Sequence, residues 1–303
     1  MSGRGKSLGS RFGYRMLALT YRVFGYRFIA AFARLISIYY WLFLRDTVAS
    51  SVDFYGALFP DETPAQRRKR ARAQFRSFTT VFVDRFLLET GHHERFTLTH
   101  EGLDGIVAAA REKRPTILWM AHLGNWEVAA HCLKRYDVPL TLVIGKYEDE
   151  KIEELQRRKL AERRIRVVVV DEASSFGAIE AVKALRAGEL VTISGDRLYG
   201  AAQRAIEVDF LGRRCRVPVG PYLLAGMTGA AIVPAFGLRE GPLRYAFRAL
   251  PPRAVDFSDR ARRDAAMAEA AQGCFDDLAA VARRHPEQWY NFFVYWEQGR
   301  TLQ

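Results

Sequence analysis

The chain has 303 residues, 49% of them hydrophobic, and its 46 lysines and arginines outnumber 34 aspartates and glutamates, which gives a formal charge of +12. A chain of this length and composition can bury a full hydrophobic core, and one domain of this size is ordinary. Cys132, Cys215 and Cys274 lie far apart without a CxxC pair, which argues against a zinc site or a disulfide framework and suits a reducing compartment. The basic excess favours an anionic membrane surface or an acidic protein as partner, with an ordinary solvated basic surface as the alternative. No nucleic-acid-reading module is evident, so nucleic acid is not expected as a partner.

Residues 14 to 45 predict an amphipathic helix that associates with a membrane. The stretch from Phe28 to Leu44 is strongly apolar but is interrupted by Arg34 and Ser37, whereas a spanning helix needs about 20 apolar residues without a central charge. Arginines recur roughly every seven residues between positions 15 and 34, which places them close to one helical face. Such a helix lies in the membrane interface, crosses the bilayer once, or packs on the protein core. We expect residues 1–60 to form a membrane-associating segment and residues 61–303 a single α/β domain.

A second basic cluster follows Pro64, on a pattern that predicts a helix. It comprises Arg67, Arg68, Lys69, Arg70, Arg72 and Arg76. This cluster is either a contact for phosphate or a carrier protein, or a solvated helix face.

The segment from Thr116 to Glu127 carries the strongest chemical signal. Its apolar run predicts a buried strand that ends at His122, and a turn at Gly124 and Asn125 precedes a helical pattern from Trp126. Asn125 is a good N-cap, which places Glu127 in the first helical turn, where the helix dipole favours an ionised carboxylate. His122 and Glu127 could then act as a general base and its orienting partner in acyl transfer to an alcohol. The alternative is a structural loop histidine beside a first-turn acid.

Strand and helix signals alternate after His122. Strands are expected at 140–145, 165–170, 190–194, 231–236 and 245–250, and helices at 149–163, 176–187, 221–228 and 260–284. This alternation predicts an α/β fold with a mainly parallel or mixed central sheet flanked by helices. His122 and Asp196 both follow strands, so they are expected to share one site at the carboxyl ends of the sheet.

Several segments resemble the bacterial lipid A biosynthesis acyltransferases of the lauroyl/myristoyl type, within the lysophospholipid acyltransferase group marked by H-x4-D/E. The resemblance runs from about residue 10 to residue 297. It is carried by residues 122–127, by Gly195-Asp196-Arg197 with Tyr199-Gly200, by Val208 to Gly212 with Pro218, Gly220 and Pro221, by Ile232 to Phe236, and by His285 to Trp289.

The resemblance implies an O-acyltransferase at the cytoplasmic face of the bacterial inner membrane, attached peripherally or by a single span. It would transfer a fatty acyl group from acyl-carrier protein or acyl-CoA to a hydroxyl of a membrane glycolipid. A lipid A-like precursor is the acceptor that the resemblance favours. His122 would deprotonate the hydroxyl and Glu127 would fix its tautomer, without a covalent acyl-enzyme. No cofactor or metal is expected. The residues expected to bind substrate are Asn125, Asp196, Arg197, Arg213 and Arg214.

One segment departs from the family pattern. The lipid A enzymes typically continue after the C-terminal signature into an Arg-rich segment, whereas Tyr290 to Trp296 reads Tyr-Asn-Phe-Phe-Val-Tyr-Trp. Because an arginine pair would suit a phosphorylated sugar, this departure leaves a phosphatidylinositol mannoside or another glycolipid as alternative acceptors. A catalytically inactive, membrane-associated lipid-binding protein is the alternative outside enzymology.

Overall fold

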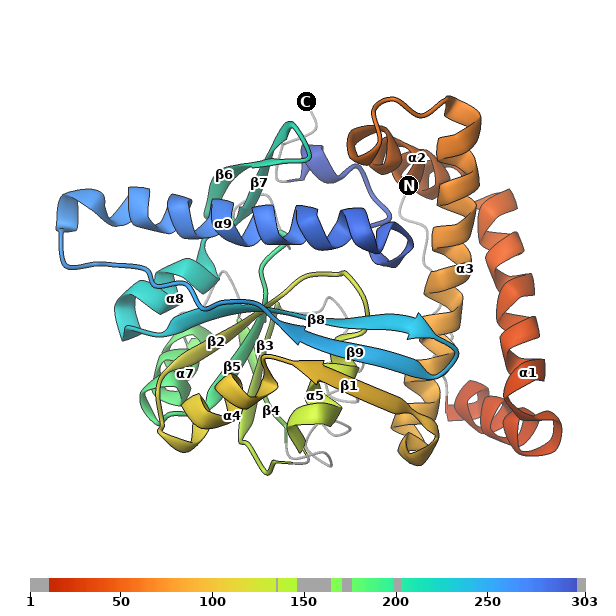
Figure 1. Cartoon of the computed structure of the whole chain (residues 1–303), viewed down its shortest axis with the longest axis horizontal. Coiled ribbons are helices and arrows are strands. Elements are labelled where there is room, and N and C mark those ends of the chain that lie inside the picture. Colours follow the sequence, from red (N-terminus) through yellow and green to blue (C-terminus); the bar gives the residue numbers. More distant parts are fainter. Residues whose placement is uncertain (1–10, 135, 146–164, 171–175, 199–202, 299–303) are drawn as a thin grey trace.

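The computed structural model of the chain describes residues 11–134, 136–145, 165–170, 176–198 and 203–298. They form a seven-stranded sheet of order β1-β9-β8-β2-β5-β3-β4 between layers of helices (Figure 1). β8 and β9 are antiparallel, and the other neighbouring pairs are parallel. The strands are β1 (Thr97–Glu101), β2 (Thr116–Met120), β3 (Leu140–Gly145), β4 (Ile165–Val170), β5 (Leu190–Ser194), β8 (Ala231–Gly241) and β9 (Arg244–Ala249). The predicted α/β class with a mainly parallel sheet is confirmed.

The central strand β2 is buried along its whole length and contributes side chains to two cores. Ile117 and Trp119 pack in the core beneath α7 (Phe176–Arg186), α8 (Gly220–Thr228) and α9 (Arg263–Arg284). Leu118 and Met120 pack in the other core, beneath α4 (Leu103–Arg111) and α5 (Trp126–Lys134). Successive side chains of a strand point to opposite faces, so a run that is apolar at every position suits a parallel strand covered on both sides.

Neither β1 nor the hairpin of β6 (Ala205–Phe210) and β7 (Arg213–Pro218) is predicted by the strand-helix alternation. The hairpin forms a separate two-stranded sheet. It turns at Leu211 and Gly212, whose φ angles of 54° and 77° are the left-handed values that a tight hairpin turn requires. The helix expected at 149–163 and the Tyr199-Gly200 pair lie outside the described residues.

Three N-terminal helices stand at one end of the sheet: α1 (Arg11–Phe43), α2 (Arg45–Leu58) and α3 (Pro64–Glu89) (Figure 1). A capping box between Thr63 and Gln66 starts α3, as the pattern after Pro64 predicts. Part of the basic cluster on α3 serves the protein itself, since Arg70 pairs with Glu62 at 2.6 Å and the Arg68 and Arg72 guanidiniums lie over the Trp41 ring.

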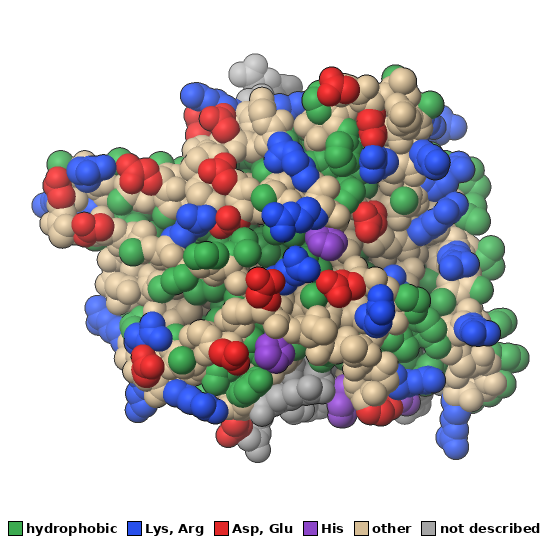
Figure 2. All heavy atoms as spheres, viewed as in Figure 1, with side chains coloured by type: hydrophobic (Ala, Val, Ile, Leu, Met, Phe, Trp, Pro, Cys, Tyr) green, Lys and Arg blue, Asp and Glu red, His purple; other side chains and the backbone are tan. Residues whose placement is uncertain are grey.

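Helix α1 differs from the prediction because it is not continuous. Gly25 has φ 71° and ψ −176°, which breaks the helix there. The arginines before and after Gly25 therefore do not share one unbroken face. Large apolar side chains are exposed on both segments and gather along the α1 edge in Figure 2. They are Leu19, Val23, Phe24, Phe28, Phe32, Leu35, Ile38, Tyr39, Leu42 and Phe43.

Within the described residues, no single helix combines the length and apolarity that crossing a bilayer demands. The stretch Leu19–Phe43 together with Arg45–Leu58 meets both criteria only as a pair, and the two parts are bent by 94°.

Candidate active site

The site is built on the segment that follows β2. Gly124 has φ 78°, and its backbone lies so close to the Gly237 carbonyl on β8 that a Cβ would overlap it. Only glycine combines this conformation with this approach. Asn125 begins the next helix as predicted, since its Oδ1 accepts a hydrogen bond from the Glu127 backbone N–H at 3.1 Å. The tight turn leaves His122 at the carboxyl end of the sheet.

The partner of His122 is Asp196, which follows the adjacent strand β5. The β2–β5 register pairs Met120 with Ser194, so the residues two positions further on face each other. Asp196 Oδ1 lies 2.8 Å from His122 Nδ1, and Asp196 Oδ2 accepts the His122 backbone N–H at 2.9 Å. The Asp196 side chain is fully buried, whereas the His122 side chain is 30% exposed. With Nδ1 held, Nε2 is the ring nitrogen left for a substrate, and it has no partner among the described residues.

Glu127 does not make the predicted contact with His122. Its Oε1 accepts hydrogen bonds from Arg85 on α3, at 3.1 Å from Nε and 2.8 Å from Nη2. The first turn of α5 directs this carboxylate toward α3, while the pairing of β2 with β5 has already brought Asp196 to Nδ1. The predicted contact between Glu127 and His122 is therefore absent from this structure, and Asp196 occupies the position expected for Glu127.

Asp196 is itself held by the C-terminal segment. Asn291 Nδ2 donates to Asp196 Oδ2 at 2.9 Å, and the Tyr295 hydroxyl donates to the Asp196 backbone carbonyl at 2.7 Å. Gln298 Nε2 reaches the same carbonyl at 3.2 Å. All three side chains are buried. The segment in which the sequence departs from the family pattern thus fixes the carboxylate that orients His122.

Comparison with known proteins identifies the family of the chain. The family described as bacterial lipid A biosynthesis acyltransferase matches residues 14–298. The chain belongs to this family. It is similar to phosphatidylinositol mannoside acyltransferases from Mycobacterium tuberculosis, at 26% identity over 230 residues, covering 74% of this chain and 69% of the relative. The corresponding enzyme of Mycolicibacterium smegmatis is 26% identical over 232 residues, covering 74% and 71%. The chain is therefore an acyltransferase.

Arg197 is positioned by the same C-terminal segment that holds Asp196. Arg197 Nη2 and Nε donate to Asn291 Oδ1 at 2.5 and 3.2 Å, and the guanidinium lies 5.1 Å from the centre of the Phe293 ring. Asn291 consequently bridges Asp196 and Arg197 through its two amide atoms. Asp196 and Arg197 form no direct salt bridge with each other and are linked through Asn291 instead.

Arg213 and Arg214 are not brought to His122 or Asp196 by the acyltransferase fold. Both start β7, next to the hairpin turn. Arg213 pairs with Asp53 of α2 at 2.8 Å and lies over the Trp296 ring, and Arg214 lies 3.6 Å from Glu207. The substrate-binding role expected for these two arginines has no support in this geometry.

The backbone of the turn is also fully engaged. The Gly124 N–H donates to the Gln288 carbonyl at 2.8 Å, and the Asn125 N–H donates to the Gly237 carbonyl at 2.7 Å. These two N–H groups are therefore not free to stabilise an oxyanion. Asn125 is buried and shapes the turn, which favours a structural role over substrate contact.

The ionisation of the site follows from the same contacts. Burial alone would raise the pKa of Asp196, but the charge and hydrogen bonds of His122 and the Asn291 amide outweigh it and hold that pKa below its usual range. Asp196 is therefore a carboxylate at neutral pH. Burial raises the pKa of the Cys215 and Cys274 thiols to about 12, which makes both poor nucleophiles. Among the described residues no group of His, Cys, Asp and Glu side chains could hold a metal ion.

Proposed function

We propose that this acyltransferase transfers a fatty acyl group from a thioester of acyl-carrier protein or coenzyme A to a hydroxyl of a membrane glycolipid. The observation that carries the proposal is a partly exposed His122 whose Nδ1 is held by the buried Asp196 carboxylate. A histidine oriented in this way is a general base for an alcohol. Family membership supports the acyl donor, and the names of the mycobacterial relatives support a glycolipid acceptor.

The reaction needs no protein nucleophile. His122 Nε2 takes the proton of the acceptor hydroxyl as its oxygen bonds to the thioester carbonyl carbon. The tetrahedral intermediate then collapses, the C–S bond breaks, and the imidazolium returns the proton to the leaving thiolate. Asp196 keeps Nδ1 as the protonated nitrogen and stabilises the imidazolium. This is the general-base mechanism expected from the sequence, with Asp196 in place of Glu127.

Arg197 is the candidate for contact with a phosphate or with the developing oxyanion. Its guanidinium is half-buried and positioned by Asn291 and by the Phe293 ring. A planar guanidinium matches the geometry of phosphate oxygens and of an oxyanion. Because its anchor is the same Asn291 that holds Asp196, the cation and the base are positioned as one unit.

The enzyme is further proposed to act at the cytoplasmic face of the bacterial inner membrane. The exposed apolar side chains of α1 support attachment at the interface, where an amphipathic helix buries such residues in the acyl region.

The acceptor is distinguished by direct assay. Purified enzyme in detergent is incubated with acyl-carrier protein or coenzyme A thioesters and, separately, with a lipid A precursor, a phosphatidylinositol mannoside or a total lipid extract, and products are followed by mass spectrometry. A new acylated glycolipid is expected, and His122→Ala should reduce its rate of formation by about 10²–10⁴-fold. If wild type and variant were equally inert with every donor and acceptor, the lipid-binding alternative would be favoured instead.

A further inference from the structure

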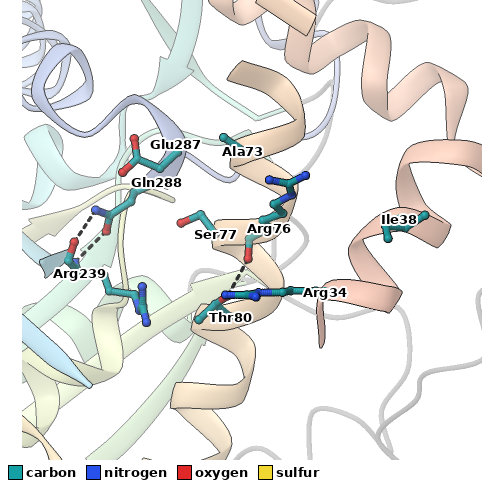
Figure 3. Close-up of a pocket in the computed structure, with 9 residues that line it drawn as sticks. All are labelled: Arg34, Ile38, Ala73, Arg76, Ser77, Thr80, Arg239, Glu287 and Gln288. Carbon is teal, nitrogen blue, oxygen red and sulfur yellow. Dashed lines mark hydrogen bonds between the residues drawn. The ribbon is translucent and has the colours of Figure 1, made fainter. Parts of the chain in front are cut away.

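A cavity of about 640 Å³ lies between α1, α3 and the turn at Glu287 and Gln288, apart from the residues that contact His122 and Asp196. Three arginines line it: Arg34 from α1, Arg76 from α3 and Arg239 from β8. In the close-up, Arg34 extends from α1 toward Thr80 on α3, and Arg239 approaches from the opposite side (Figure 3). Three separate elements thus direct guanidiniums toward one space.

The charges in this cavity are unbalanced. Arg239 is paired with the buried Asp84 at 2.9 Å, and Glu287 is the one acidic residue in the lining. Arg34 and Arg76 form no ion pair with any described residue, and both are exposed. Two guanidiniums that form no ion pair, facing one concave space, suit an anion with several oxygens such as a phosphate group.

The apolar surroundings indicate where that phosphate comes from. Ile38, one helical turn after Arg34, also lines the cavity and is half exposed. The exposed side chains of Leu35, Tyr39 and Leu42 extend this apolar surface along the same part of α1. A phosphate held by the arginines would have its acyl chains along this apolar surface. A soluble phosphate would leave that surface in water.

We propose that this cavity, which neither His122 nor Asp196 lines, is a binding site for the phosphate of an anionic membrane phospholipid. Basic pockets beside membrane-embedded helices bind anionic lipid head groups in this way. Residues of the cavity wall also contact the turn that follows His122 and the C-terminal segment. The Gln288 carbonyl accepts the Gly124 N–H, and Ser77 Oγ lies 2.9 Å from the Tyr290 hydroxyl. A phospholipid bound here would therefore set the orientation of the His122 turn relative to the bilayer.

The first test compares two variants with equal charge. Arg34→Gln/Arg76→Gln empties the cavity of its two unpaired cations, and Arg111→Gln/Arg260→Gln removes two exposed cations from α4 and from the turn before α9. Co-sedimentation is measured with phosphatidylcholine vesicles with and without phosphatidylglycerol. Each guanidinium near the lipid surface is expected to contribute about fivefold, so the cavity pair should weaken binding to phosphatidylglycerol vesicles by about 25-fold. The control pair should change it by less than about twofold, and equal losses in both variants would overturn the site.

The second test places a probe inside the cavity. The three native cysteines are buried, so Ala73→Cys, on the cavity wall, and Ala254→Cys, an exposed position outside the cavity, can each be labelled with a neutral maleimide. Phosphatidylglycerol vesicles should slow labelling of the cavity cysteine and leave the other unchanged. Binding of vesicles without protection of Ala73→Cys would contradict the location. Protection by glycerol phosphate as strong as that by vesicles would contradict a lipid as the ligand.

Discussion

The carboxylate of Asp196 accepts two hydrogen bonds from a single residue, His122: one from the ring Nδ1 at 2.8 Å and one from the backbone N–H at 2.9 Å. The first fixes the ring orientation and the second fixes the turn that carries the ring. Each oxygen of this fully buried carboxylate thus accepts a hydrogen bond from His122. This arrangement holds the imidazole with Nε2 toward the substrate before any substrate arrives, which lowers the cost of reaching the reactive geometry.

Asn291→Asp tests the contact that holds Asp196. The new carboxylate would place an oxygen about where Nδ2 now lies, 2.9 Å from Asp196 Oδ2, and two buried carboxylates at that distance repel each other. We expect a loss of about 1–3 kcal/mol in unfolding free energy and at least about tenfold in kcat at neutral pH. Asn291→Ala, which adds no charge, should lose less. Urea melts and initial rates measure both, and an Asp variant as active as wild type would contradict the role of Asn291.

Gly195→Ala tests how β5 presents Asp196. A Cβ at Gly195 would overlap the indole of Trp119, which is fully buried and cannot move aside. Overpacking of this kind costs about 1–3 kcal/mol. The matched control is Gly105→Ala in α4, where a Cβ meets nothing within 4 Å and where alanine should stabilise the helix by about 0.5–1 kcal/mol. We expect the melting temperature to fall for Gly195→Ala and to rise for Gly105→Ala. Equal changes of melting temperature in both variants would contradict the geometry of β5.

Acid stability tests the ionisation of Asp196. Its folded-state pKa is lowered from 3.8, so the folded protein binds fewer protons than the unfolded chain and the carboxylate's contribution is present above about pH 4. As the pH falls below about 4 that contribution is lost, and the stability difference between wild type and Asp196→Asn should shrink. The pKa of Asp84 is shifted in the opposite direction, since burial raises it. The difference between wild type and Asp84→Asn should therefore grow toward acid pH in the same denaturation series.

Local patterns predicted much of the site. The run from Thr116 to Met120 identifies β2, and Gly124 and Asn125 identify the turn, because strand, turn and N-cap preferences depend on neighbouring residues. Local patterns did not predict the partner of His122. Glu127 is near in sequence and satisfies the spacing, whereas Asp196 reaches Nδ1 through the pairing of β2 with β5.

The residues that hold Asp196 were even harder to predict from the sequence. Asn291 and Tyr295 lie more than ninety residues from Asp196, and nothing in their local sequence indicates which strand end they contact. The aromatic replacement of the Arg-rich segment was the available signal, and it marks the residues that hold Asp196. The break of α1 at Gly25 was likewise missed, since a single glycine inside a helical pattern is often tolerated.

The most direct test of the central claim compares kcat/KM at neutral pH for Asp196→Asn and Glu127→Gln. Asp196→Asn should lower kcat/KM by about 10²–10⁴-fold, because the carboxylate that holds Nδ1 and stabilises the imidazolium is gone. Glu127→Gln, which removes the pairing with Arg85, should lose much less activity. If Glu127→Gln lost that activity and Asp196→Asn kept it, Asp196 would not be the partner of the catalytic histidine.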